Sequence, residues 1–386
     1  MKIAFISTMK GCAWGGSEEL WVAAAAAAMD ENNEVLVSSY DWGEMTGKKI
    51  LSLWHKGATL ELRAREKVCK TPSLGERVFN KLKRLARISA SPARKGSYDF
   101  VLDFDPQLVL ISQGATYDFL EEHDLLDMLQ KLNKPYFVVC HSYTEAFALH
   151  PLHRKTAVRF FNGAKGVFLV ARSHIGVLQR QLAARLNQVT VVRNPVNLQR
   201  FGVVPLPAAD ATQFAVVGHL EVIWKGQDLL FELLGQDKWL ARNWTLNVYG
   251  SGGNQEYLED LCKFYQIGHR VVFHGFVSDI RKVWTENHLL LMPSRQEVAP
   301  IALVEAMLCG RTAVVTNVGG IKEWIRDEEN GFVAEAPTVN CYDATLERAW
   351  GKRMDWALFG ERAYQQAMNM VDAHPGKTLI DKMIDA

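Results

Sequence analysis

Two glutamates beside one predicted helix start are the residues of this sequence best placed to do chemistry. Glu297 and Glu305 stand eight positions apart in the stretch 293–310, which follows an apolar run typical of a buried strand. Pro300 suits the first position of a helix, and Gly310 suits its end. If the chain between the two glutamates were wholly helical, they would lie about 12 Å apart along the helix axis.

The backbone between these two glutamates is suited to binding an anion. Amides at the positive end of a helix form a natural phosphate site, and the backbone concerned here is that of Ala299, Pro300, Ile301 and Ala302. A carboxylate, a phosphate site and a second carboxylate, in that order, match the sugar, the diphosphate and the ribose of a nucleotide-sugar. Taken alone, the stretch fits equally well a capping acid followed by a surface acid.

Length and composition indicate an ordinary globular protein. The 386 residues leave room for two domains, and 48% hydrophobic residues with a net charge of +1 give no sign of a nucleic-acid partner. Six scattered cysteines without a C-x-x-C pair argue against a disulfide framework or a zinc site. Residues 1–9 are too short for a signal peptide, and the longest apolar run, residues 20–29, is half a membrane span. We therefore expect a cytoplasmic protein.

Short apolar segments alternate with helical patterns along the chain, which predicts an α/β fold with parallel sheets. The pattern runs twice, so two sheets are expected. The predicted strands cover residues 2–7, 34–39, 108–112, 136–140 and 166–171 in the first series, and 214–218, 246–249, 271–277, 288–292 and 312–316 in the second.

A glycine-rich loop, residues 11–17, joins the first strand to an alanine-rich helix. This is the layout of a phosphate-binding loop, but neither common fingerprint is matched. A Walker A loop would need lysine after Gly16, where Ser17 stands, and G-x-G-x-x-G is absent from the loop. On the residues alone, a tight turn between strand and helix explains the glycines as well.

His141 and Lys225 stand where α/β sheets place their ligand-binding residues. His141 follows the strand at 136–140, and the carboxyl ends of parallel strands border the ligand crevice. Lys225 precedes Gly226 shortly after the strand at 214–218, and lysine is a flexible point charge suited to phosphate. A structural histidine and an ordinary surface lysine are the alternatives.

Three motifs of the C-terminal half occur in a fixed order. They are Glu297-x7-Glu305, the sequence Glu-Ala-Met-x-x-Gly that begins at Glu305, and Val318-Gly319-Gly320-x-x-Glu323. This order resembles the donor-site signature of glycosyltransferase family 4, and the resemblance extends over nearly the whole chain. It implies the GT-B fold, in which two Rossmann-like domains with parallel sheets face each other across a cleft. It also implies sugar transfer with retention of anomeric configuration.

The same resemblance implies roles for the candidate residues. Glu297 would face the donor sugar, Glu305 would hold the ribose hydroxyls, and Lys225 would neutralise the leaving diphosphate. His141 would lie near the donor sugar. His219 stands where the family usually has arginine, and it offers at most one positive charge without a bidentate fork. The implied donor-binding residues also include Gly15, Gly16, Gly250 and the backbone of Val277.

The strand pattern and the resemblance together predict three parts of the chain. Residues 1–196 form an acceptor-side domain, residues 197–360 form a donor-side domain, and residues 361–386 form a helical segment that returns to the first domain. Pro195 would fix the backbone where the chain crosses between the domains. The expected packing anchors of the last helices are aromatic: Trp350, Trp356 and Phe359.

The resemblance implies a glycosyltransferase that moves a sugar from a UDP- or GDP-linked donor to an acceptor hydroxyl. The acceptor would be a glycan or lipid-linked molecule in the synthesis of surface polysaccharide, lipopolysaccharide or glycolipid. No metal or other cofactor is expected, because the donor half lacks an Asp-x-Asp between apolar strands; Asp103-Phe-Asp105 is predicted to lie in a loop of the first domain. The alternatives are a non-catalytic nucleotide-sugar-binding partner subunit, which the His219 departure favours, and a sugar-nucleotide epimerase or phosphorylase on the same fold.

A basic segment, residues 61–96, adds a prediction about the surroundings of the protein. It carries eleven Lys and Arg against three Glu, and part of it has an amphipathic helical pattern. A basic amphipathic helix can lie on an anionic membrane surface. It can equally pack on its own domain with a solvated charged face.

Overall fold

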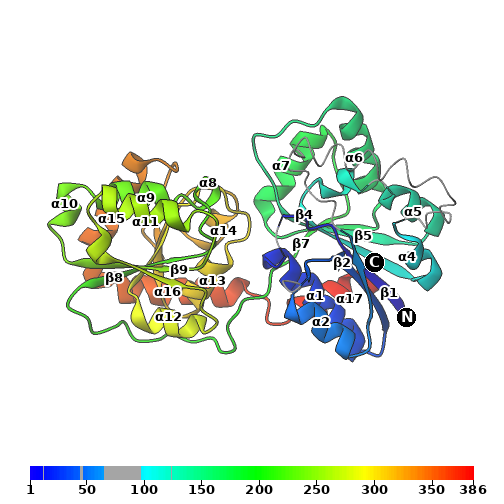
Figure 1. Cartoon of the computed structure of the whole chain (residues 1–386), viewed down its shortest axis with the longest axis horizontal. Helices are drawn as coiled ribbons and strands as arrows, with labels where there is room; N and C mark the ends of the chain where they lie inside the picture. The colour runs from blue at the N-terminus through cyan, green and yellow to red at the C-terminus, as the bar shows by residue number, and fades with distance from the viewer. Residues whose placement is uncertain (12, 44–46, 65–96, 123) are drawn as a thin grey trace, which may run out of the picture.

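The computed structural model describes residues 1–11, 13–43, 47–64, 97–122 and 124–386. Within these residues the chain forms two α/β domains, each built on one sheet whose strand pairs are all parallel (Figure 1). The N-terminal sheet has the order β3-β2-β1-β4-β5-β6-β7, and the C-terminal sheet has the order β10-β9-β8-β11-β12-β13. The predicted α/β fold with two parallel sheets is therefore confirmed.

The N-terminal strands are short and apolar because helices cover both faces of their sheet. The strands are β1 (Lys2–Ser7), β2 (Glu34–Tyr40), β3 (Thr59–Arg63), β4 (Leu108–Ala115), β5 (Tyr136–Ser142), β6 (Gly166–Leu169) and β7 (Val189–Val191). The helices are α1 (Gly16–Asp30), α2 (Lys48–His55), α4 (Asp99–Phe104), η2 (Asp118–Glu121), α5 (Leu125–Leu132), α6 (Pro151–Gly163) and α7 (Arg172–Leu182).

The C-terminal domain repeats the alternation of strand and helix. Its strands are β8 (Thr212–Val217), β9 (Trp244–Tyr249), β10 (Val271–Gly275), β11 (Leu289–Met292), β12 (Thr312–Thr316) and β13 (Phe332–Ala334). Its helices are α8 (Val222–Lys225), α9 (Gln227–Leu234), α10 (Asp237–Leu240), α11 (Gln255–Phe264), η3 (Gly268–Arg270), α12 (Ile280–Glu286), α13 (Ile301–Leu308), α14 (Ile321–Trp324), α15 (Val339–Gly351), η4 (Arg353–Asp355) and α16 (Trp356–Met370).

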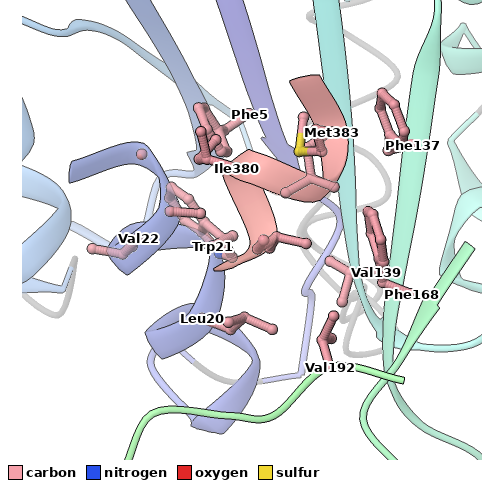
Figure 2. Close-up of a cluster of buried hydrophobic side chains, with 14 of the residues drawn as sticks. Phe5, Leu20, Trp21, Val22, Phe137, Val139, Phe168, Val192, Ile380 and Met383 are labelled. Atoms are coloured by element: carbon pink, nitrogen blue, oxygen red, sulfur yellow. The ribbon is translucent and has the colours of Figure 1, made fainter. Parts of the chain in front are cut away.

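The last helix, α17 (Pro375–Ile384), leaves the C-terminal domain and packs beside α1 of the N-terminal domain (Figure 1). Its Ile380 and Met383 are buried in the cluster that also holds Phe5 and Trp21 (Figure 2). The two helices approach so closely that a Cβ on Gly376 would lie 2.4 Å from the backbone of Ala23. The end of the chain thus ties the two domains together.

The structure differs from the sequence-based predictions at the end of the chain. The aromatic side chains of Trp350, Trp356 and Phe359 pack in the core of the C-terminal domain and do not anchor the returning helix. Helix α16 likewise packs on α13 and β12, so the return to the N-terminal domain starts after α16 and not at residue 361. Aromatic residues near a chain end indicate burial but not the domain that buries them.

Two smaller predictions also change. Helix α13 begins at Ile301, with Pro300 as its N-cap and not as its first residue. Asp103, predicted to lie in a loop, belongs to α4, and Asp105 follows that helix in the left-handed conformation.

Residues 65–96 of the predicted basic segment lie outside the described residues. Among the described helices, none is both long and apolar enough to cross a membrane.

Candidate active site

Lys225 and Glu297 meet at the carboxyl edge of the C-terminal sheet. Lys225 ends α8, which follows β8, and Glu297 lies in the loop after β11, which pairs with β8. Lys225 Nζ lies 2.5 Å from Glu297 Oε1, and Ser294 Oγ donates a hydrogen bond of 2.9 Å to the same oxygen. Glu297 is buried, and Lys225 is half-buried. The structure therefore brings two predicted site residues into direct contact.

The two segments that carry this pair are also held together by their neighbours. The amides of Arg295 and Gln296 donate to the carbonyl of Trp224 at 2.8 and 3.1 Å. The Arg295 guanidinium binds the two carboxylate oxygens of Asp228 at 2.7 and 2.8 Å. A bidentate arginine–carboxylate pair fixes direction as well as distance, so the two segments are held together by contacts other than that between Lys225 and Glu297.

Two glycines let the backbone close around this loop. Gly226 has φ +66°, and a Cβ built there would lie 2.1 Å from the carbonyl oxygen of Pro293. Gly319 has φ +56°, and its Cβ would lie 1.4 Å from the carbonyl oxygen of Glu297. Only glycine combines a left-handed conformation with such a close backbone approach. Gly319 belongs to the predicted Val-Gly-Gly motif, whose function here is to seat the Glu297 loop.

Helix α13 carries the predicted anion site and the second glutamate. The amides of its first turn have no acceptor within the helix and point out of its N-terminal end, where Ala299, Pro300, Ile301 and Ala302 lie. Glu305 is buried, and its Oε1 accepts hydrogen bonds of 2.7 and 3.1 Å from the backbone and side-chain nitrogens of Asn197. Glu305 is the residue predicted to bind the ribose, and one of its two carboxylate oxygens already accepts hydrogen bonds from Asn197 in the segment that links the domains.

Burial raises the pKa of Glu305 to about 7, against the hydrogen bonds from Asn197, which lower it. The carboxyl group is therefore only part-ionised near neutral pH. A protonated Glu305 could donate as well as accept a hydrogen bond.

The glycine loop of the N-terminal domain faces α13. A Cβ on Gly16 would lie 2.9 Å from Cδ1 of Ile301, so the start of α1 and the start of α13 touch across the domain interface. Gly15 is the N-cap of α1 in an extended conformation that any residue adopts. Of the two predicted glycines, Gly16 lies where a side chain would collide with the neighbouring domain.

Side-chain contacts that the sequence did not predict join the two domains near Glu297. Gln296 Nε2 donates to the carbonyl of Tyr143 at 2.6 Å. Glu323 accepts from the amide of Arg172 at 2.6 Å and from the guanidinium of Arg193 at 3.1 Å. The Val-Gly-Gly-x-x-Glu motif indicates that Glu323 matters to the site, but it does not identify the residues that Glu323 binds. The candidate site therefore lies at the domain interface.

His141 lies on the N-terminal side of this interface, at the carboxyl end of β5. Its Nε2 is 3.4 Å from the hydroxyl of Ser112. Burial lowers the pKa of His141 to about 4, so the ring is neutral at physiological pH. It can then exchange hydrogen bonds with a sugar hydroxyl but cannot supply a positive charge.

A second buried histidine, His174, was missed by the sequence analysis. It lies on α7, 2.8 Å from the hydroxyl of Thr116, with the Tyr143 ring 4.6 Å away between centroids. Burial and then the neighbouring His141 lower the pKa of His174 to about 3. No pattern in the sequence places α7 beside the end of β5, so only the fold could reveal this neighbour.

The remaining predicted residues are less closely associated with the Lys225–Glu297 pair. His219 is exposed, and among the described residues its ring forms no hydrogen bond or ion pair with Lys225 or Glu297. Gly250 has φ +135°, and a Cβ there would lie 1.9 Å from the carbonyl oxygen of Gly218, so its role is to let β8 and β9 end together. Val277 packs at the edge of the C-terminal core.

A buried polar cluster lies at the carboxyl edge of the N-terminal sheet and was also missed. Arg63 Nη1 lies 3.2 Å from Glu122 Oε2, and Tyr98 donates to the same oxygen at 2.6 Å. Tyr40 donates to the other oxygen, and Lys10 Nζ lies 3.1 Å from it. Burial alone would raise the pKa of Glu122, but the Arg63 charge and the tyrosine hydroxyls hold it below its ordinary value.

No group of three or more His, Cys, Asp or Glu side chains that could hold a metal ion occurs in the part of the chain that the structure describes.

Comparison with known proteins identifies the C-terminal domain. A family model described as "Glycosyl transferases group 1" matches residues 204–366, which run from just before β8 into α16. The C-terminal domain belongs to the glycosyl transferases group 1 family. Lys225, Glu297 and Glu305 all lie within this group 1 domain.

Curated relatives agree with this family. An uncharacterised glycosyltransferase of Methanocaldococcus jannaschii is 43% identical over 94 residues, which are 23% of this chain and 24% of the relative. One chain of the human phosphatidylinositol N-acetylglucosaminyltransferase is 33% identical over 174 residues, which are 44% of this chain and 35% of that protein. The matches thus span about a quarter to a third of the length of these relatives.

Solved structures show the fold of the whole chain. The Anabaena protein Alr3699/HepE, crystallised in complex with UDP, matches over 100% of both chains with a TM-score of 0.71 and 18% identity. The fold of the chain is GT-B, as predicted. The group 1 domain is the C-terminal half of that fold.

Proposed function

We propose that the protein is a retaining, metal-independent glycosyltransferase of family 4, which moves a sugar from a nucleotide-sugar to an acceptor hydroxyl. The observation that carries the proposal is the contact between Lys225 and Glu297 beside the first turn of α13. A cation, a helix start and a carboxylate stand together there, at the interface with the other domain.

Each of these groups has a task in the proposed reaction. Lys225 and the outward amides of α13 would stabilise the negative charge that develops on the departing diphosphate. Glu297 would orient the donor sugar, and the neutral His141 would bind one of its hydroxyls. The leaving phosphate itself would take the proton of the acceptor hydroxyl as the new glycosidic bond forms on the same face. The Lys225–Glu297 contact would have to loosen as the diphosphate enters.

The names of the similar proteins support the donor class. Alr3699/HepE has been crystallised with UDP and with UDP-glucose, and the human relative is named an N-acetylglucosaminyltransferase. We propose a UDP-sugar first and a GDP-sugar second. The acceptor would be a glycan or lipid-linked molecule in surface polysaccharide, lipopolysaccharide or glycolipid synthesis. The cytoplasmic location and a membrane contact through residues 61–96 stay predictions.

The test is transfer by the full chain from a panel of UDP-, GDP- and ADP-sugars to glycan and lipid-linked acceptors. Proton NMR would follow the anomeric configuration of the product, with EDTA or magnesium in parallel samples. We expect acceptor-dependent release of one nucleoside diphosphate, an axial linkage from an axial donor, and equal rates in EDTA. Inversion of the anomeric configuration would refute the retaining mechanism, and a strict need for magnesium would refute metal independence. Binding of nucleotide without turnover for any acceptor would refute the transferase activity.

A further inference from the structure

The charge of the chain is unevenly distributed, although its net value is only +1. Residues 146–209 contain nine Lys and Arg and no Asp or Glu. This acid-free stretch includes α6 and α7, which lie next to each other on one side of the N-terminal domain (Figure 1). A local excess of one sign over a continuous surface attracts partners of the opposite sign.

A groove of about 570 Å³ opens between these two helices. The α6 wall carries Arg154, Lys155 and Arg159, with the part-buried Val158 among them. The other wall is apolar: Ala183 and Ala184 follow the end of α7, beside the buried Leu182. A groove with these two walls fits a ligand that has an anionic group joined to an apolar part.

The three cations of the groove are not neutralised from within the protein. Among the described residues, Arg154, Lys155 and Arg159 form no ion pair, and α6 and α7 contain no acid. Other cations of the acid-free stretch do have partners, since Arg180 pairs with Glu145 and Arg193 with Glu323. Within the part of the chain that the structure describes, Lys165, Arg172, Arg185 and Arg200 form no ion pair either, so the three groove cations belong to a wider positive surface without compensation.

Helix α6 also exposes an apolar side chain beside these charges. Leu152 is 66% exposed, and it precedes Lys155 and Arg159 by three and seven positions. Residues at this spacing share one face of a helix. An exposed leucine beside basic side chains lets one face offer both an apolar contact and charge to an anionic bilayer surface.

We propose that the α6–α7 groove and the Leu152 face of α6 bind the head groups of anionic lipids at a membrane surface. A free phosphate ion would leave the apolar wall and Leu152 in water, whereas a lipid covers both. A nucleic acid would find the same cations but would gain nothing from the apolar wall. The groove lies outside residues 61–96, so this membrane contact is separate from the predicted one.

The position of α6 gives this contact a consequence for the candidate site. A short loop, residues 143–150, joins α6 to β5, whose carboxyl end carries His141. A bilayer that rests on the start of α6 would lie beside the domain interface. Lipid binding can be measured without donor or acceptor, so the inference does not depend on the proposed transfer activity.

The experiment is co-sedimentation of the full chain with phosphatidylcholine vesicles that contain 0 or about 30% phosphatidylglycerol. We expect binding to the anionic vesicles only. Each basic side chain near an anionic bilayer strengthens binding about fivefold, so the double variant Lys155→Gln/Arg159→Gln should bind about 25-fold more weakly. The matched control is Lys131→Gln/Lys382→Gln, which removes two exposed lysines from elsewhere and should bind as the unmodified protein does.

Two further measurements separate lipid from other anions. The variant Leu152→Gln should lose vesicle affinity while the affinity for soluble sn-glycerol 1-phosphate stays unchanged. A short RNA duplex should not displace the protein from vesicles. The proposal is overturned if the unmodified protein ignores anionic vesicles, or if both double variants lose affinity equally. It is also overturned if glycerol phosphate or the duplex binds the groove at least as tightly as the vesicles do.

Discussion

At the carboxyl edge of the C-terminal sheet, side-chain pairs such as Lys225–Glu297 are carried by loops whose backbones pack directly on one another, whereas the carboxyl edge of the N-terminal sheet is held by side chains paired with side chains. In the C-terminal domain, Gly226 and Gly319 bring the loops against the carbonyls of Pro293 and Glu297. In the N-terminal domain, the corresponding edge is a network of ionised and hydroxyl groups around Glu122.

This difference explains why the carboxyl edge of the C-terminal sheet can be predicted from sequence motifs and that of the N-terminal sheet cannot. A close backbone approach needs glycine at a fixed position, so it leaves a motif with fixed spacing. A side-chain network needs only that its members meet in space, and Arg63 and Glu122 are 59 positions apart. A site built on close backbone contacts is disrupted when a glycine gains a side chain. A site built on paired side chains is disrupted when one member of a charged pair is removed.

The largest effect expected from this contrast is that of Gly319→Ala. The new Cβ would stand 1.4 Å from a backbone oxygen, in a left-handed conformation, so the Glu297 loop must move. We expect the free energy of unfolding of the C-terminal domain to fall by more than about 5 kcal/mol. Urea unfolding followed by hydrogen exchange would assign the loss to a domain.

Gly176→Ala is the matched control for this change. Gly176 lies inside α7, has no atom within 4 Å of the added Cβ, and should gain up to about 1 kcal/mol in stability. If both alanine variants had the same stability, the backbone account of the C-terminal edge would be wrong.

The next effect is that of Arg63→Met in the N-terminal network. Removing one partner of a buried ion pair leaves the other charge without compensation and costs about 3–5 kcal/mol. Arg63 and Glu122 are both buried, so we expect a loss of this size, confined to the N-terminal domain. The control is Arg348→Met, which breaks an exposed cluster with Asp327 and Glu328 and should cost below about 1 kcal/mol. A loss at Arg63 no larger than the loss at Arg348 would speak against the network.

A smaller effect, visible only as a function of pH, concerns Glu305. Its pKa is about 7 in the folded protein against an ordinary 4.5, so this group makes the protein less stable as pH rises from about 4.5 to 7. Glu305→Gln removes that dependence. The stability of the variant relative to the unmodified protein should therefore increase by about 3 kcal/mol between pH 4.5 and pH 8. Urea unfolding at the two pH values measures this difference, and an unchanged difference would contradict the buried, part-protonated state.

Sequence reasoning predicted the two parallel sheets and the segments that carry the candidate site. It placed Lys225 and Glu297 at the same sheet edge, where the structure brings them into contact, because strand order and loop glycines can be read from the sequence; their roles in binding and catalysis stay predictions. It did not find His174, Gln296 or the partners of Glu323, since each depends on how the two domains or distant loops meet. It also misplaced the aromatic anchors of α15 and α16, because hydrophobicity predicts burial without naming the domain.

The measurement that tests the central claim most directly is calorimetry and turnover on Glu297→Gln beside Lys225→Gln. The proposed reaction gives the two residues different tasks, although they touch. Glu297→Gln frees Lys225, so the nucleoside diphosphate should bind at least as tightly as to the unmodified protein while kcat falls by about 100-fold. Lys225→Gln should weaken binding of the diphosphate itself, by roughly 10- to 100-fold. Equal losses of binding and turnover in Glu297→Gln would contradict the assignment of this pair as a donor site.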